Sequence, residues 1–235
     1  MFDPKDLELL KNIVQHDLLR FIGETLAMTF LPTVIAFLIG LPLGILLVVG
    51  EEDGILPLPK AVMKVIHVVI NLLRSLPFLI LLLVVMPLSR AIVGTSVGTA
   101  AMIVPLSIAA FPFVARLVET SIREVDHGVV EAALSMGASP AQIICKVLIP
   151  EAKPALIANF MVSMITIFGY GAMSGAVGGG GLGNMAIQYG YNRHRPLVMY
   201  AAAVLLILLV QIFQTIGMLI ARRLDRRRTG GAASE

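Results

Sequence analysis

Charged residues are scarce in this chain: they make up 14% of its 235 residues, whereas soluble domains average about a quarter. Hydrophobic residues account for 57%, and the mean hydropathy is +0.91. The apolar residues are gathered into long runs without charge, which a soluble domain could not bury. The composition therefore excludes an ordinary soluble domain and predicts an integral membrane protein.

Several kinds of site are also missing. The single cysteine, Cys145, excludes an internal disulfide, and no cysteine and histidine spacing resembles a zinc or iron–sulfur site. The chain has no G-x-x-x-x-G-K-[ST] loop, so it cannot bind ATP in the P-loop manner. The G-x-G-x-x-G of Gly178, Gly180 and Gly183 follows an apolar run rather than a strand, so we reject a dinucleotide site. We expect no catalytic residue, cofactor or metal site.

Five segments are long and apolar enough to cross a hydrocarbon core of about 30 Å as helices. They are residues 25–50, 65–87, 91–115, 154–171 and 196–221. The predicted fold class is therefore all-α: a polytopic integral membrane protein with five transmembrane helices. None of these segments contains a carboxylate, which argues against a proton-coupled carrier.

Arg74 is the one charged residue inside these segments. A charge within a membrane is costly unless it faces protein, water or an interface. We favour a structural role, in which Arg74 reaches the cytoplasmic headgroups, over a place in the translocation path. Its neighbour Pro77 predicts a kink unless adjacent helices accommodate the ring.

Small and polar residues within the segments suggest how the helices pack. The pairs Gly40 and Gly44, Gly94 and Gly98, and Gly171 and Gly175 have the spacing that lets membrane helices approach closely. The fourth segment and the residues just after it carry Asn159, Ser163, Thr166 and Ser174. These polar side chains either line a pathway or bond between helices, and the sequence leaves both alternatives open.

The distribution of basic residues predicts the orientation. Lysines and arginines near span ends are retained in the cytoplasm, and one orientation places eleven of them inside, five in the tail, against six outside. This orientation puts the N-terminus outside and the C-terminus in the cytoplasm. Residues 1–22 repeat apolar residues every three or four positions, so we expect a helix that lies on the outer interface or packs against the spans. Residues 23–217 would form the membrane domain, and residues 218–235 a basic cytoplasmic tail.

The longest segment between predicted spans, residues 116–153, is patterned as two short helices. Asp126 can cap the first helix, and Gly137 supplies the left-handed residue that commonly ends one. Ser139 and Gln142 form a capping box for the second helix, which we expect to stop at Pro150. A compact helix–turn–helix with small alanines suits docking into another protein's groove, although it can equally be an ordered loop.

This loop resembles the EAA loop of ABC importer permeases. Glu131, Ala132 and Ala133 are followed three residues later by Gly137, and nine residues further by Val-Leu-Ile-Pro ending at Pro150. The family pattern is EAA-x3-G-x9-I-x-L-P, and the two departures, both in the last element, are conservative. The resemblance implies a type I ABC importer transmembrane domain, in which these five residues couple the permease to a cytoplasmic ATPase. Hydrolysis of ATP would belong to that partner.

The segment 175–191, GAVGGGGLGNMAIQYGY, is similar to the region between the last two spans of methionine uptake permeases. Further similar segments lie between about residues 23 and 217. The resemblance implies a homodimeric permease of the bacterial inner membrane that imports L- and possibly D-methionine with an ATPase dimer and an extracytoplasmic methionine-binding lipoprotein. It does not identify substrate-binding residues. Permeases for glycine betaine or choline carry a related glycine tract, and an ATP-independent channel or carrier is the alternative from another class.

Overall fold

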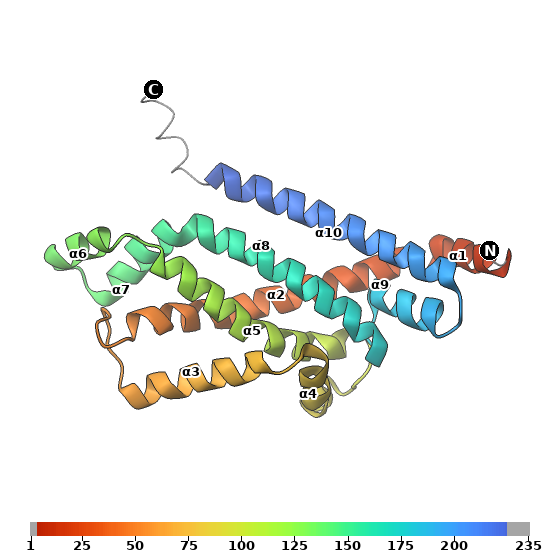
Figure 1. The fold of residues 1–235 in the computed structure, drawn as a ribbon, viewed down its shortest axis with the longest axis horizontal. Helices are drawn as coiled ribbons and strands as arrows, with labels where there is room; N and C mark the ends of the chain where they lie inside the picture. The colour runs from red at the N-terminus through yellow and green to blue at the C-terminus, as the bar shows by residue number, and fades with distance from the viewer. Residues whose placement is uncertain (1–3, 225–235) are drawn as a thin grey trace, which may run out of the picture.

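The computed structural model describes residues 4–224, and side chains are described from residue 6 to residue 220. Every regular element among these residues is helical (Figure 1). In chain order they are α1 Pro4–His16, α2 Leu18–Val49, α3 Lys60–Ser75, α4 Phe78–Val93, α5 Thr99–Arg123, α6 His127–Ser135, α7 Pro140–Ile143, η1 Ile144–Leu148, α8 Ile149–Ser174, η2 Gly175–Val177, α9 Gly181–Asn184, η3 Met185–Tyr191 and α10 Pro196–Leu224. The predicted all-α class is confirmed.

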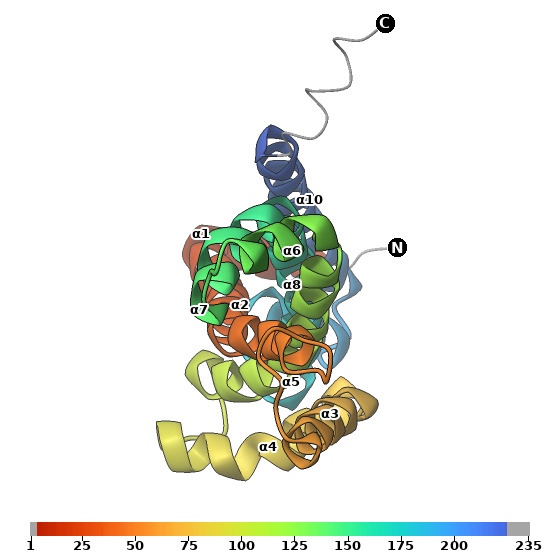
Figure 2. The ribbon, with the colours of Figure 1, turned by 90° about the vertical axis from the view of Figure 1, so that its left-hand side faces the viewer.

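Four continuous helical stretches are long and apolar enough to cross a membrane: α2, α5, the run from Pro140 to Val177, and α10 from Pro196 to Ile220. The helices α3 and α4 together provide a fifth crossing if the bent pair counts as one span. In Figure 1, α2, α3, α5, α8 and α10 run along the long axis of the molecule, whereas α4 is seen end-on, lying across it. Figure 2 shows α4 extending sideways below the bundle.

The predicted second span, residues 65–87, is wrong as a single helix. The chain bends by 111° between α3 and α4. Pro77 has no N–H to donate, and its ring disfavours a helical conformation in the residue before it. Leu76 and Pro77 are accordingly extended, with ψ angles of 130° and 137°. The proline therefore divides the span into two helices rather than kinking one.

The predicted third span, residues 91–115, also has different limits. α4 continues to Val93, and α5 begins only at Thr99. Gly94 and Gly98 have φ angles of 83° and 94°, which lie in the left-handed region that glycine tolerates best. This pair of glycines therefore ends one helix and precedes the next, and it does not form the predicted helix-packing surface.

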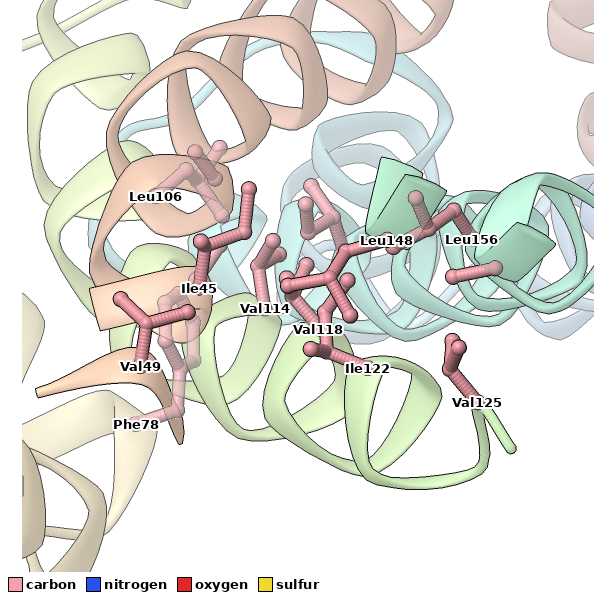
Figure 3. Packing of buried hydrophobic residues seen from close by; sticks show 14 of the residues in the cluster. Ile45, Val49, Phe78, Leu106, Val114, Val118, Ile122, Val125, Leu148 and Leu156 are labelled. Carbon is pink, nitrogen blue, oxygen red and sulfur yellow. The ribbon is translucent and has the colours of Figure 1, made fainter. Parts of the chain in front are cut away.

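The glycines Gly40 and Gly44 do form a close helix contact. They lie in α2 against α5, and a Cβ atom added to Gly44 would lie 2.5 Å from the Ala115 carbonyl oxygen and 2.6 Å from the Val118 Cβ. Around this contact, the largest buried cluster includes Ile45 and Val49 of α2 with Val114, Val118 and Ile122 of α5 (Figure 3). The absence of side chains on α2 lets the two backbones approach and pack by van der Waals contact.

The N-terminal helix packs against the rest of the protein. Ile13 of α1 is 2% exposed in a cluster with Leu182 and Val198. The predicted stripe does not all face inward, since Leu7 and Val14 are exposed. The inward face of α1 therefore packs against neighbouring helices, and a position of residues 1–22 on the outer interface stays a prediction.

Replacing Gly44 by alanine should destabilise the protein, because the new methyl group would press on the α5 backbone rather than on a movable side chain. Overpacking of this kind typically costs about 1–3 kcal/mol. Gly23→Ala is the matched control, since a Cβ atom at Gly23 of the same helix meets nothing within 4 Å. Thermal unfolding in one detergent compares the two variants. Equal melting temperatures would contradict the α2–α5 contact.

Candidate functional site

The loop between α5 and α8 folds as the sequence predicts in its first half. The Asp126 carboxylate accepts a hydrogen bond from the Gly128 N–H at 2.7 Å and caps α6. At the other end, the N–H groups of Gly137 and Ala138 donate to the carbonyls of Leu134 and Ala133. This is a Schellman motif, and the φ of 76° at Gly137 is its left-handed residue. The predicted helix ends are confirmed.

The second half of the loop is only partly as predicted. Ser139 and Gln142 form the expected capping box. The helix does not stop at Pro150, however, because the run from Pro140 continues into α8 as one span candidate. The chain passes through a π-helical turn at Ile144–Leu148, in which the Ile149 N–H donates to the Ile144 carbonyl. A wider turn of this kind accommodates the missing N–H of Pro150 without breaking the helix.

Four of the five predicted coupling residues lie at different levels of one projection, formed by α6, α7 and the turn between them. We call this projection the hairpin. Ala133 is 5% exposed and anchors α6 to the core, whereas Glu131, Ala132 and Gly137 are exposed. Pro150 is exposed too, but it lies in the first turn of α8 rather than in α6. The hairpin lies at one end of the molecule (Figures 1 and 2).

The tip of the hairpin is apolar as well as exposed. Met136, in the turn after α6, is 82% exposed, and Leu134 and Val129 are 48% and 42% exposed. Exposed large apolar side chains grouped at one end are typical of a surface that another protein covers. The sequence pattern did not single out Met136, although an uncharged apolar residue between a helix and its terminating glycine is a usable signal.

A cavity of about 570 Å³ lies beside the hairpin. Its wall includes the charged side chains Glu51, Asp53, Arg123 and Glu131, with apolar residues such as Leu148. The Glu131 of the predicted motif therefore borders a recess between the hairpin and the loop that follows α2. Side chains of a docked protein have room to enter it.

An ionic network joins this end of α5 to two other elements. Arg123 donates to both carboxylate oxygens of Glu51, at 2.6 and 3.1 Å, and also to Glu119. Arg116 donates to Glu119 at 2.6 Å and to the Asn71 amide oxygen of α3 at 3.0 Å. Glu119 is 8% exposed and lies inside α5, which extends beyond the predicted third span. The membrane-spanning candidate α5 thus contains a carboxylate, although none was expected within the predicted spans. Arg116 and Arg123 of the same helix neutralise the charge of Glu119.

Glu51, in the loop after α2, shows the electrostatic effect of this network. The hydrogen bond from Arg123 lowers the pKa of the Glu51 carboxyl below its usual value, because it stabilises the ionised form. Sequence analysis missed Glu51 since 72 residues separate it from Arg123. The contacts of Glu119 with Arg116 and Arg123 could have been predicted, because these residues lie three and four positions away in the same helix.

The opposite end of the molecule holds the glycine tract. The Gly181 N–H donates to the Glu24 carboxylate at 2.7 Å, and the Leu182 N–H donates to the Thr25 hydroxyl at 2.8 Å. Glu24, one residue before the predicted first span, therefore lies inside α2 and holds the tract. Among residues 4–224, the tract is preceded by a helix rather than by a strand.

The polar residues of α8 mostly bond within the protein. The Asn159 amide donates to the Leu117 carbonyl and to the Ser121 hydroxyl of α5. Ser163, Thr166 and Ser174 donate to carbonyls three or four residues earlier in the same helix. For Asn159, the structure favours a hydrogen bond between helices over a place in a pathway.

An ion pair joins α1 to the segment before α10. Arg195 pairs with the buried Asp6 at 2.8 Å.

Comparison with known proteins identifies the class of this fold. Residues 40–230 match the family described as the binding-protein-dependent transport system inner membrane component. The chain belongs to this family, and it is therefore a membrane-spanning permease of a transport system.

Particular relatives refine this class. The chain is 46% identical over 213 residues, 89% of its length and 93% of the relative's, to the "Probable D-methionine transport system permease protein MetI" of Vibrio cholerae. It is 48% identical over 168 residues, 72% of its length and 76% of the relative's, to the "Methionine import system permease protein MetP" of Bacillus subtilis. The "D-methionine transport system permease protein MetI" of Escherichia coli K12 is 46% identical over 158 residues, covering 67% of this chain and 72% of that protein.

Solved structures agree with the fold. A chain of the MetNI methionine ABC transporter in an inward-facing conformation is 46% identical, with a TM-score of 0.86 over 89% of this chain and 96% of that one. A chain of an amino acid ABC transporter solved with histidines has a TM-score of 0.75 over 92% of this chain and 97% of that one, at 23% identity, and so supports the fold alone. The expectation of a type I ABC importer fold is confirmed.

Replacing Glu119 by glutamine should destabilise the protein by about 2 kcal/mol, because charge-assisted hydrogen bonds from Arg116 and Arg123 lose their anionic partner. The control is Glu124→Gln, at the exposed C-cap of the same helix. Unfolding in detergent at neutral pH measures both variants. Equal stability of the two would show that the network does not hold the end of α5.

Proposed function

We propose that this chain is the permease subunit of an ATP-driven importer for methionine, with both L-methionine and D-methionine as substrates. The observation that carries the proposal is the exposed, apolar hairpin at one end of a permease fold whose relatives are named for methionine transport. The hairpin offers a docking surface for an ATPase subunit, and the names of the relatives support methionine as the substrate. Catalysis does not belong to this chain.

The energy reaches the chain through a cytoplasmic ATPase dimer. Glu131, Ala132 and Ala133 lie on α6, and Gly137 terminates it, so the helix presents small and apolar side chains outward while Ala133 holds its base. Small side chains allow a partner's groove to approach closely. Pro150 acts differently, since it lies in the helix that carries movement of the hairpin into the span.

The proposed docking of the hairpin also supports an orientation for the protein in the membrane. In Figure 1, the end of α10 lies toward the same end of the molecule as α6 and α7, and α1 lies toward the other end. An ATPase is cytoplasmic, so the C-terminal end is inside the cell and the N-terminal end outside. This agrees with the distribution of basic residues. The predicted basic tail, 218–235, begins within α10, and its residues 225–235 lie outside the described part of the chain.

The other partners follow from the two remaining surfaces. The glycine tract held by Glu24 and Thr25 faces outward in this orientation, where an extracytoplasmic methionine-binding lipoprotein delivers substrate. Large exposed apolar residues on α3 and α4, such as Leu72 and Val84, suit contact with lipid or with a second copy of the chain. The working unit is a homodimer in the inner membrane, with residues 23–217 as the permease domain.

Uptake by intact cells tests the substrate. Cells that lack their own methionine importers receive this chain with its ATPase and binding protein, and labelled methionine and glycine betaine are supplied with and without ATP depletion. We expect methionine uptake that requires both the chain and ATP. Uptake of betaine instead would overturn the substrate, and flux that persists without ATP would overturn the importer. Matched cells with an empty vector are the control.

The docking surface has its own test. Met136→Glu should abolish co-purification of the ATPase and methionine uptake, because a charge at the apolar tip opposes burial in a partner's groove. The fold should be unaffected, since Met136 is 82% exposed. Met136→Leu, which keeps an apolar side chain of similar size, should retain both activities. An ATPase that still binds the glutamate variant would place the docking surface elsewhere.

A further inference from the structure

The break between α3 and α4 borders a cavity of about 200 Å³. Its lining combines Arg74 and Phe78 from the two sides of the break with Ala109 and Phe113 of α5 and Tyr170 of α8. Three separate helical regions therefore converge on it. Broken membrane helices are typical of transporter substrate sites, because irregular backbone at membrane depth is tolerated only where it faces protein or a cavity.

Arg74 gives this cavity a cationic wall. It lies in the last turn of α3, and no acceptor among the described residues takes a hydrogen bond from its guanidinium. α3 begins at Lys60, so Arg74 is about 21 Å along the helix, farther than an arginine side chain extends. That distance weighs against the expected contact with cytoplasmic headgroups. The Arg74 side chain is exposed at the surface of the single chain, and an unpaired guanidinium within a membrane span requires an anionic or polar partner.

The start of α4 adds to the same electrostatic field. Pro77 at the N-cap offers no side-chain hydrogen bond to the first turn, and the Ile80 and Leu81 N–H groups turn back to the Pro77 carbonyl. The Phe78 N–H, one residue after the break, has no helical acceptor. The positive end of a helix of 16 residues therefore lies beside Arg74 at the cavity.

Aromatic rings form the apolar wall. Phe78 and Tyr170 are stacked, with ring centroids 4.4 Å apart and planes 4° from parallel, and Phe113 lies on the same cavity. Such rings bind an aliphatic or thioether chain, and sulfur makes favourable contacts with aromatic rings. The cavity thus offers a carboxylate-binding side and an apolar side within one small volume.

We propose that this cavity is a binding site on the transport path for the amino acid itself. Arg74 receives the carboxylate, and the Phe78–Tyr170 pair receives the apolar side chain. The proposal rests on the proposed function in that it takes the cargo to be an amino acid. It goes further by giving the permease its own recognition of the carboxylate, separate from selection by a binding protein.

Photo-crosslinking tests the site directly. The assembled transporter is incubated with photo-methionine, which carries a diazirine in its side chain, then irradiated, digested and examined by mass spectrometry. We expect crosslinks on peptides that contain Phe78, Phe113 or Tyr170, and excess methionine should remove them. Crosslinks confined to other peptides would overturn the site.

Variants then isolate the role of the charge. Arg74→Gln should raise the half-saturating concentration for crosslinking by roughly ten-fold or more, because a charge-assisted hydrogen bond is lost. Arg74→Lys should recover part of the affinity. Arg90→Gln, at an exposed arginine in the last turn of α4, is the matched control and should leave the concentration unchanged. Equal half-saturation for the Arg74→Gln variant and the wild type would overturn the role of Arg74.

Two further measurements distinguish binding of methionine at Arg74 from binding of lipid, and failure of this site from failure of the proposed function. If Arg74 binds an anionic lipid headgroup, its replacement will matter only in vesicles that contain anionic lipid, and crosslinking in zwitterionic vesicles will be equal for Arg74→Gln and wild type; that outcome overturns the proposal. Uptake of methionine by cells is measured alongside. Normal uptake without crosslinks at the cavity would reject this site and keep the importer, whereas absence of methionine uptake would reject both.

Discussion

The close approach of α2 and α5 at Gly40 and Gly44 is the contact on which the other helices depend. Because glycine has no side chain, the α2 backbone lies directly against Val114, Ala115 and Val118 of α5. In lipid, association of helices depends on such van der Waals packing rather than on the hydrophobic effect. α5 is therefore fixed on one side, and its other faces are free to contact α3, α4 and α8. The ionic network and the two cavities described above each include residues of α5.

The second constraint is the demand that every backbone polar group in a membrane be satisfied. Pro77 and Pro150 both lack an N–H, yet the helix breaks at the first proline and continues through the second. At Pro150 the backbone widens to a π turn and the helix continues, so α7 of the hairpin runs into α8 without a break. At Pro77 the chain turns by 111°, and the break lies against α5 and α8. The difference depends on neighbouring helices, which no local pattern encodes.

This contrast marks how far the sequence could predict the structure. Features determined within a few residues were predicted correctly, including the Asp126 cap, the left-handed Gly137 and the Ser139 capping box. Each of these depends on backbone hydrogen bonds between near neighbours. The number of apolar segments was also readable, because lipid requires long runs of apolar residues.

Features that depend on tertiary contacts were not predictable. Gly40 and Gly44 have the same spacing as Gly94 and Gly98, but the first pair packs two helices and the second pair connects two helices with positive φ angles. Likewise, Glu51 lies far from Arg123 in the sequence, and only the fold brings them together. Spacing alone cannot say whether a glycine pair lies within a helix or which distant charge will pair.

The helix α5 connects the two ends of the proposed mechanism. Ala109 and Phe113 line the cavity at the broken helix, Arg116 and Glu119 lie in the ionic network, and the chain reaches the Asp126 cap of the hairpin three residues after α5 ends at Arg123. A helix is stiff over this distance of about 21 Å from Ala109 to Arg123. If a partner displaces the hairpin, as the proposed coupling requires, α5 either moves as a body, which shifts Phe113 in the cavity, or stays in place while the bonds between Arg123 and Glu51 break. Under these two proposals, the network would determine how much of the hairpin's movement reaches the cavity, because the strength of those bonds sets which of the two responses requires less free energy.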